Sequence, residues 1–209
     1  MRKSAKKNYI ANPKGTTEHE VILCVTLLGI ETPIWRRLRM SANMTLDQLH
    51  YAIQGSFGWE NCHLHAFTIG GKTYSSNQPA PTGLFGETGD QDSKKVTIAD
   101  LIEQKIKKFT YEYDFGDSWT HEIKIEKAIP CAKQIKATEC IDGKRNCPPE
   151  DCGGIWGYEE FVKAMKNKKH PEHRDLIDWY GGPFDPDKFS LQNANKLIKS
   201  YQKYQGCNS

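Results

Sequence analysis

Three histidines stand in segments whose residue patterns predict β-strands. His63 and His65 are two residues apart, so in a strand both project from the same face. His121 falls on the inner, aromatic face of a second predicted strand. Imidazole binds zinc and related cations, so a site of three histidines, or of two histidines and a carboxylate, could be assembled here. The alternative is a core histidine, packed among residues such as Trp119 and Phe67, with both ring nitrogens hydrogen-bonded.

A second group of candidates lies at the tip of a predicted β-hairpin, in the segment 113–119 (Tyr-Asp-Phe-Gly-Asp-Ser-Trp). Asp114 and Asp117 could coordinate a cation or position a water molecule, and Trp119 opens the returning strand. Aspartate and glycine are also ordinary turn residues, because they tolerate the backbone that a tight turn requires. The tip is therefore either a binding site or only a turn.

A loop rich in proline and glycine carries two consecutive carboxylates, Glu150 and Asp151. Two prolines directly before them fix the backbone and a glycine pair after them permits positive φ, so we expect the loop to hold one shape. The carboxylates could bind a metal or act as acid and base. They could equally accept hydrogen bonds from the backbone of their own loop.

Three cysteines surround the same loop, at Cys140, Cys147 and Cys152. Zinc, or another divalent metal, could be held by their thiolates, with His121 or a water molecule as the fourth ligand. Their spacings of six and four intervening residues differ from the paired C-x-x-C pattern of structural zinc sites. The alternative is three buried or half-exposed thiols.

We expect these groups to converge on one concave surface, because turns and rigid loops present polar groups without disturbing the core. Gathered carboxylates repel one another, and a neighbouring imidazolium or a metal ion would relieve that repulsion. The candidate shared site comprises His65, Asp114, Asp117, Trp119, His121, Glu150 and Asp151.

The elements that must position these groups predict an α+β fold: a mostly antiparallel sheet of hairpins with packed helices and a helical C-terminal part. Hairpins are predicted at 20–40, 63–75 and 108–129. The first strand, 20–28, is apolar nearly throughout, which is typical of a strand covered on both faces. Helices are predicted at 45–57, 98–104, 158–167, from 171 and at 191–204, whereas 76–95 is a predicted loop and 130–157 show no periodicity.

The hairpin at 108–129 has the clearest alternation. Tyr111, Tyr113, Trp119 and His121 fall on one face, which we expect to point to the core because a buried face fixes the register.

Size and charge favour a single domain over 18–205, preceded by a flexible basic tail at 1–17. The net charge of +3 is too small to imply a polyanion partner, and local basic groups such as Arg36, Arg37 and Arg39 are interpreted as solvated. The longest apolar run, 21–30, is half a membrane span and lacks a signal-peptide cleavage pattern, so we expect a cytoplasmic protein without a membrane partner. Its seven cysteines are then expected to be thiols.

Several stretches resemble a known family in their order and spacing. They are 34–38 (Ile-Trp-Arg-Arg-Leu), 45–50 (Thr-Leu-Asp-Gln-Leu-His), 63–67 (His-Leu-His-Ala-Phe), 113–121 (Tyr-Asp-Phe-Gly-Asp-Ser-Trp-Thr-His) and 147–154 (Cys-Pro-Pro-Glu-Asp-Cys-Gly-Gly). Over about residues 20–180 the chain is similar to the Ri-plasmid ORF-three-like family, found on plasmids, within insertion elements and in microbial chromosomes.

The resemblance implies no catalytic activity. Some relatives are labelled resolvases of transposable elements, but this sequence shows no serine-recombinase pattern, so that label is not carried over. Others are fused to DNA-binding repressor domains, which would make this module a partner domain and not the DNA reader.

Two functions follow as expectations, and whether the protein is an enzyme stays open between them. The first is a mobile-element-associated binding or accessory module that recognises a ligand, a protein or a nucleic acid. Support for nucleic acid is weak, because the few charges of the basic tail give only salt-sensitive attachment. The second is a metal-dependent hydrolase, with its metal held by the histidine, aspartate and glutamate residues of the candidate site.

Overall fold

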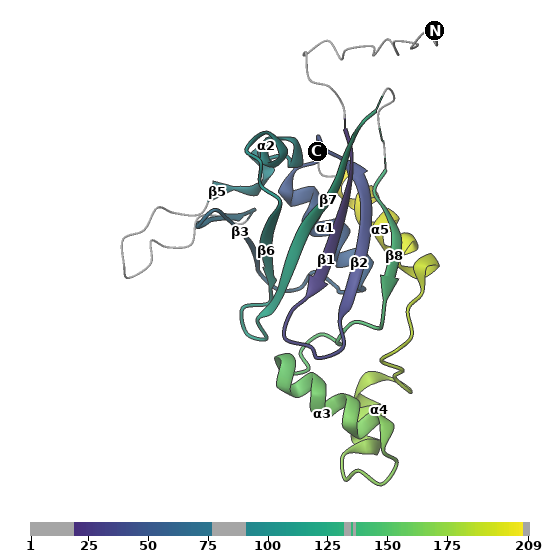
Figure 1. Ribbon diagram of the computed structural model, residues 1–209. Coiled ribbons are helices and arrows are strands. Elements are labelled where there is room, and N and C mark those ends of the chain that lie inside the picture. Colours follow the sequence, from purple (N-terminus) through teal and green to yellow (C-terminus); the bar gives the residue numbers. More distant parts are fainter. Residues whose placement is uncertain (1–18, 77–90, 132–134, 136, 207–209) are drawn as a thin grey trace, which may run out of the picture.

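A computed structural model describes residues 19–76, 91–131, 135 and 137–206. Figure 1 shows one twisted sheet, helices packed on it, and a further helix pair beyond one end of the strands. The elements in chain order are β1 (His19–Leu27), β2 (Ile34–Ser41), α1 (Leu46–Phe57), β3 (His65–Ile69), β4 (Lys72–Ser75), β5 (Gln91–Asp92), η1 (Ser93–Lys95), α2 (Ile98–Glu103), β6 (Lys108–Tyr113), β7 (Trp119–Pro130), β8 (Glu139–Lys144), α3 (Gly154–Lys166), α4 (His173–Tyr180) and α5 (Leu191–Gly206). The predicted tail at 1–17 lies outside the described residues.

The described strands form one sheet in the order β5-β4-β3-β6-β7-β1-β2-β8. All of its pairings are antiparallel except the parallel contact between β4 and β5. The three predicted hairpins are all present, as β1–β2, β3–β4 and β6–β7. The predicted α+β fold with a mostly antiparallel sheet is therefore confirmed.

The sheet buries one face much more completely than the other. In the central strand β1, Val21, Leu23 and Val25 are fully buried on one face, whereas on the other face Cys24 and Thr26 are partly exposed and Ile22 is 8% exposed. The expectation that β1 is covered on both faces is therefore wrong. Its alternation is that of an antiparallel strand with one face turned toward solvent.

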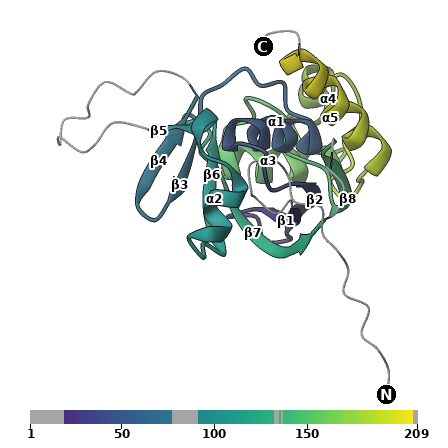
Figure 2. The same ribbon diagram turned by 90° about the horizontal axis from the view of Figure 1, so that it is seen from above.

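Helix α1 packs on the buried face of the sheet, as the view in Figure 2 shows. Thr45 caps it, because the Thr45 hydroxyl accepts from the N–H of Gln48 while the Gln48 side chain accepts from the N–H of Thr45. The helix ends at Gly58, whose φ of 94° is readily adopted only by glycine. The apolar stripe of the predicted 45–57 helix therefore forms part of the core. In the described part of the chain no helix is long and apolar enough to cross a membrane.

The β6–β7 hairpin places its aromatic face in the core, as predicted. Tyr111, Tyr113, Trp119 and His121 are each 0% exposed. Tyr113 pairs with Trp119, and Tyr111 with His121, so the four side chains form two adjacent cross-strand pairs on one face.

Three further features of the fold differ from the sequence-based expectations. The segment 130–157, which has no periodicity, contains the edge strand β8, which pairs with β2 through an irregular register. Arg36, interpreted as solvated, is instead 2% exposed and lies on the core face of β2 together with Ile34 and Leu38. Most of the predicted loop at 76–95 lies outside the described residues, and its last five residues form β5 and η1.

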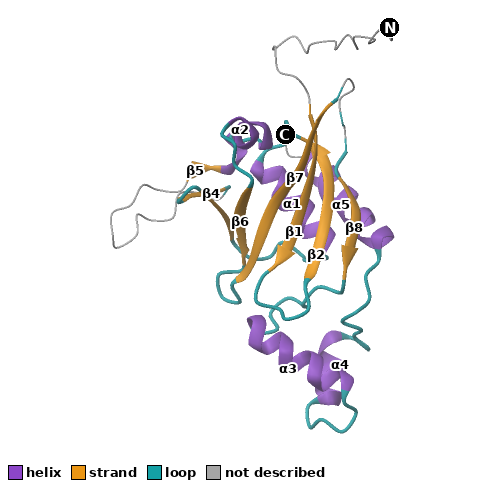
Figure 3. Cartoon of the chain, viewed as in Figure 1, coloured by secondary structure: helices purple, strands orange, loops and turns teal. Residues whose placement is uncertain are grey.

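The C-terminal helices occupy two places. Figure 3 shows α3 and α4 beyond the strand ends, near the β6–β7 turn, and α5 returning to the sheet. Helix α5 packs against both α1 and β8. Phe161 of α3 is buried, and its ring contacts those of Trp179 and Phe184.

The contact between α1 and α5 gives a first prediction. A Cβ atom on Gly55 would lie 2.7 Å from the backbone nitrogen of Ile198. Gly-to-Ala substitution normally stabilises a helix, but here the backbone of α5 blocks the new methyl group. We expect Gly55→Ala to lower the free energy of unfolding by about 1 to 3 kcal/mol in urea denaturation. Ser200→Ala, at an exposed position of α5, is the control and should change it by less than about 0.5 kcal/mol.

Candidate functional site

The hairpin tip is a tight turn built around Asp114. Its φ of 56° lies in the left-handed region, which aspartate tolerates better than most residues. Its carboxylate oxygen Oδ1 accepts from the N–H of Gly116 at 2.9 Å, and its carbonyl accepts from the N–H of Ser118 at 2.6 Å. Its own N–H donates to the carbonyl of Leu64 at 2.9 Å. The turn thus holds one carboxylate oxygen of Asp114 and leaves the other, Oδ2, to face neighbouring groups.

Asp117 joins the tip to the loop that precedes α3. Its Oδ2 accepts from the N–H of Gly153 at 3.1 Å, next to the first residue of the helix. A carboxylate is favourable at this position, because it meets the unsatisfied N–H groups of a helix N-terminus. Asp117 therefore fixes the position of the segment that carries Glu150 and Asp151.

The segment after α1, residues 59–63, is also held by hydrogen bonds. The Nε1–H of Trp59 donates to the carbonyl of Pro148 at 3.1 Å. Asn61, with a φ of 59°, donates its N–H to the side chain of Gln54, and its Oδ1 lies 2.7 Å from Nε2 of His50. These contacts hold the backbone at residues 62 and 63 against both α1 and the proline-rich loop.

Glu150 reaches into the space between these segments. Its Oε1 accepts from the N–H of Glu60 at 2.8 Å and from the hydroxyl of Tyr113 at 3.0 Å. Burial raises the pKa of Glu150, and the two hydrogen bonds offset only part of that effect. Its second oxygen, Oε2, is buried and has no hydrogen bond to any residue that the structure describes.

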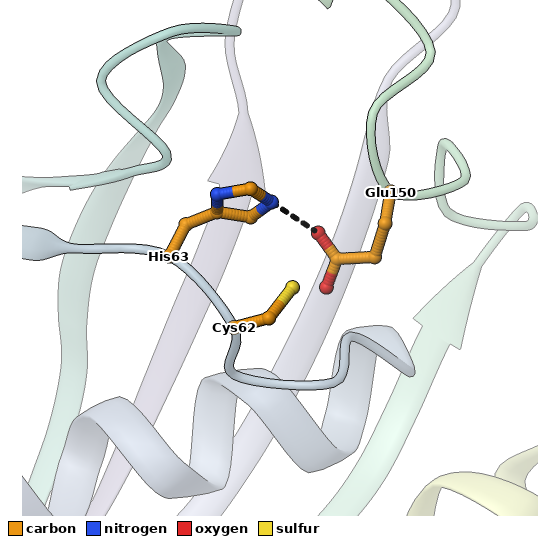
Figure 4. Close-up of side chains that lie close together, drawn as sticks. All are labelled: Cys62, His63 and Glu150. Atoms are coloured by element: carbon orange, nitrogen blue, oxygen red, sulfur yellow. Dashed lines mark ion pairs between the residues drawn. The ribbon is translucent and has the colours of Figure 1, made fainter.

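His63 lies where the three segments meet. Its Nε2 is 3.1 Å from Oδ1 of Asp151, 3.7 Å from Oδ2 of Asp114 and 3.9 Å from Oε2 of Glu150. Figure 4 shows His63 and Glu150 facing each other, with the thiol of Cys62 beside them. Two overlapping groups, Cys62 with His63 and Glu150, and His63 with Asp114 and Asp151, each have ligand atoms within 4.8 Å of one another. We call these five residues the His63 cluster.

Each of the two groups in the His63 cluster has the donors and spacing of a transition-metal site. Ligand atoms 2.0 to 2.3 Å from a tetrahedral zinc ion are about 3.3 to 3.8 Å apart, close to the distances from Nε2 of His63 to the three carboxylates. Three carboxylates carry more negative charge than one imidazolium can balance. Nε2 of His63 is buried and, within the described residues, has no hydrogen bond. The mixture of nitrogen, oxygen and sulfur suits zinc or a related ion better than calcium or magnesium, which prefer oxygen alone.

Three of the seven sequence-predicted candidates lie in the core. His65 stacks on His50 with ring centroids 3.5 Å apart, and burial lowers the pKa of His65 to about 4. Trp119 and His121 are fully buried, and burial lowers the pKa of His121 to about 3. The structure does not bring these three to the carboxylates. It does bring Asp114, Glu150 and Asp151 together, with Asp117 at their edge.

The cysteines proposed as zinc ligands do not gather in the described structure. Neither group of ligand atoms found there includes Cys140, Cys147 or Cys152. The Sγ of Cys140 lies 3.2 Å from the carbonyl of Asp142, to which it donates. Burial raises the pKa of Cys147 well above its usual value and that of Cys152 to about 12, so both are thiols at neutral pH.

The candidate shared site left out Cys62 and His63, although His63 was considered as a metal ligand together with His65 and His121. His63 was grouped with His65 on one strand face, but β3 begins at His65, so His63 lies in the preceding loop. The register would have placed it correctly: His65 pairs with Tyr113, so the residues before His65 must run beside the turn that follows Tyr113. For Cys62 the sequence offers only its position next to His63.

Comparisons with known proteins agree with this fold. The family model described as plasmid pRiA4b ORF-3-like protein matches residues 19–193, which include the whole His63 cluster. An uncharacterised protein of Sinorhizobium fredii, y4hQ, is 33% identical over 180 residues, which cover 85% of this chain and 90% of that protein. The crystal structure of a protein of unknown function from Methanosarcina mazei Go1 is similar with a TM-score of 0.75 and 33% identity, covering 85% of this chain and 97% of the other.

Proposed function

Because this chain belongs to the plasmid pRiA4b ORF-3-like family, whose matched relatives have no stated activity, we propose its function from the site: a binding module centred on a divalent-cation site at the His63 cluster. The single observation that carries the proposal is the convergence of three carboxylates within 4 Å of one imidazole nitrogen. Nε2 of His63 and the facing oxygens of Asp114, Asp151 and Glu150 are the ligands we propose, with the thiol of Cys62 within reach.

The hydrogen bonds around the cluster support a metal site. Metal-ligating carboxylates are commonly oriented by hydrogen bonds through their other oxygen. Asp114 and Glu150 both have this arrangement, because Oδ1 of Asp114 is held by Gly116 and Oε1 of Glu150 by Glu60 and Tyr113. The oxygens that face His63 are then available for a cation.

The partner of this module is a separate part of the proposal. We propose that the module recognises a ligand, a protein or a nucleic acid connected with mobile elements, because the family description names a plasmid protein.

Metal-dependent hydrolysis is the second candidate, and one observation favours it. Burial raises the pKa of Glu150. In this reaction His63, Asp114 and Asp151 alone would hold the metal, and Glu150 beside them would not be a ligand but would exchange a proton with a metal-activated water. Turnover of an ester or phosphate substrate only by the metal-loaded protein would favour this reaction over a binding role alone.

The metal proposal gives a second prediction. The purified, metal-free protein should bind one Co²⁺ or Zn²⁺ per chain in calorimetric titration. His63→Gln and Asp114→Asn should each weaken binding about tenfold or more, because each removes a ligand. Asp142→Asn, which removes an exposed carboxylate paired with Arg37, is the matched control and should leave the affinity within about twofold. Wild-type protein that binds neither ion, or variants that bind like wild type with native circular dichroism, would contradict the site.

A further inference from the structure

Arg36 is a buried cation in the middle of the sheet. It lies on the core face of β2 and is 2% exposed. Its Nε donates to the carbonyl of Ser56 at 2.8 Å, and its Nη1 donates to the carbonyls of Trp35 and Lys144, each at 2.9 Å. These three carbonyls satisfy donors of the guanidinium, but they bring no formal negative charge.

No counter-charge for Arg36 is present among the residues that the structure describes. It forms no ion pair with any of them, and its Nη2 has no hydrogen bond to them. The neighbouring thiols of Cys140 and Cys147 have pKa values raised by burial, so they are neutral at pH 7. Burying a charge without an opposite charge nearby costs free energy of folding. Packing alone therefore does not explain an arginine at this position.

The guanidinium is also held in one place. Its Cζ lies over the rings of both Phe57 and Phe189, at 4.8 and 4.3 Å from their centroids. The backbone of β8 closes this stack, since a Cβ on Gly143 would lie 2.7 Å from the Phe189 ring and 3.0 Å from Cδ of Arg36. A cation fixed in this way is pre-organised to meet a ligand.

Arg36 lines a cavity of about 650 Å³ between the end of α1, the segment before α5 and α5 itself. Lys188 lines the same cavity and forms no ion pair within the described residues, and Asp185 is the acidic residue of the lining. Asn146 and Asn193 add amide groups, and Phe57, Phe184 and Phe189 add apolar surface. The cavity therefore combines two cations and one carboxylate with aromatic walls, in the size range of small-molecule sites.

We propose that this cavity binds a small organic oxyanion, a carboxylate or phosphate on a compact apolar body, with Arg36 and Lys188 facing the anionic group and the phenylalanines enclosing the body. Guanidinium groups pair with carboxylate and phosphate oxygens with particular strength. None of the residues that line the cavity belongs to the His63 cluster, so this site is independent of the proposed metal site.

The probes are benzoate and phenyl phosphate, which carry the two kinds of oxyanion, and benzamide, a neutral molecule of the same shape. In calorimetric titrations of the full chain, we expect at least one of the two anions to bind about tenfold or more tightly than benzamide. Lys188→Gln, an exposed position, should weaken that binding about threefold or more, and Arg36→Gln about tenfold or more. Arg37→Gln, on the opposite face of β2, is the matched control and should change it by less than about twofold.

Equal affinity for benzamide and the anions would overturn the proposal, as would a failure of both anions to bind. Equal losses in the Lys188→Gln and Arg37→Gln variants would also overturn it, because they would show only a general effect of charge. If Arg36→Gln does not fold, the benzamide comparison and Lys188→Gln decide the matter, since neither disturbs the hydrogen bonds of Arg36. The anion that binds more tightly distinguishes a carboxylate from a phosphate ligand.

Discussion

Acidification from pH 7 to pH 5 should lower the free energy of unfolding by about 5 kcal/mol, a large part of the stability of a typical domain. The cause is three buried histidines. Burial lowers the pKa of His121 to about 3 and of His65 to about 4, and it lowers that of His50 well below its usual value. The unfolded chain therefore binds protons below about pH 6.5 that the native protein excludes.

The sign and the pH window follow from these shifts. A histidine whose native pKa is depressed has its full stabilising effect above its unfolded pKa of about 6.5, and it loses about 1.4 kcal/mol per pH unit as the pH falls toward the native pKa. His50 and His65 are stacked, so they resist joint protonation and titrate as a coupled pair. Glu150 and Asp47, whose pKa values burial raises, act in the opposite direction and offset part of the loss near pH 4 to 5.

His121 gives the sharpest test of this explanation. Both of its ring nitrogens are buried, and the nearby carbonyls of Tyr111 and Trp119 form no hydrogen bond of normal geometry with them. The edges of the Phe57 and Trp59 rings surround it, so phenylalanine can occupy the same space.

In urea denaturation at pH 7, 6 and 5, His121→Phe should reduce the loss of unfolding free energy between pH 7 and pH 5 by about 2 kcal/mol, most of it between pH 6 and pH 5. His170→Gln removes an imidazole from a partly exposed loop and serves as the control. A wild-type stability that is constant between pH 7 and pH 5 would contradict the buried, neutral state of these histidines.

The strands and helices that form the core could be predicted because each has a periodic pattern and a local signal at its end. The β6–β7 hairpin alternates without a break, and α1 has both its Thr45 cap and its Gly58 stop. Strand β8 has no such pattern, because it lies at the sheet edge and Cys140 is its one fully buried residue. Arg36 could not be placed either, since its burial depends on carbonyls and aromatic rings from distant segments.

The candidate site could be predicted in part, because some of its residues belong to turns. Asp114, Glu150 and Asp151 belong to turns, and turns hold polar groups at the surface of the fold. The histidines were harder to assign, because a shift of two residues in the start of β3 decides which imidazole faces the carboxylates. His63 precedes the strand and meets them, whereas His65 lies within it and is buried against His50.

Gly154→Ala should lower the free energy of unfolding by about 3 kcal/mol or more. Gly154 has a φ of 67°, a conformation that side chains disfavour, and a Cβ there would lie 2.8 Å from the backbone carbonyl oxygen of Asp117. That oxygen cannot rotate away, because Asp117 also accepts from the N–H of Gly153 through its side chain. The strain must therefore separate the hairpin tip from the loop that carries Glu150 and Asp151.

Gly181→Ala is the matched control, because Gly181 has a φ of 83° but a Cβ there would meet no atom within 4 Å. It measures the backbone strain alone, about 1 to 2 kcal/mol, so the excess in Gly154→Ala measures the contact with Asp117.

The same pair of variants separates folding from function. Moving the tip away from the loop displaces Asp114 relative to Asp151, the two carboxylates that face His63 from opposite segments, so Gly154→Ala should also weaken Co²⁺ binding while Gly181→Ala leaves it unchanged. Equal losses of stability in the two variants would show that the tip and the loop are not in fixed contact, and the geometry of the His63 cluster depends on that contact.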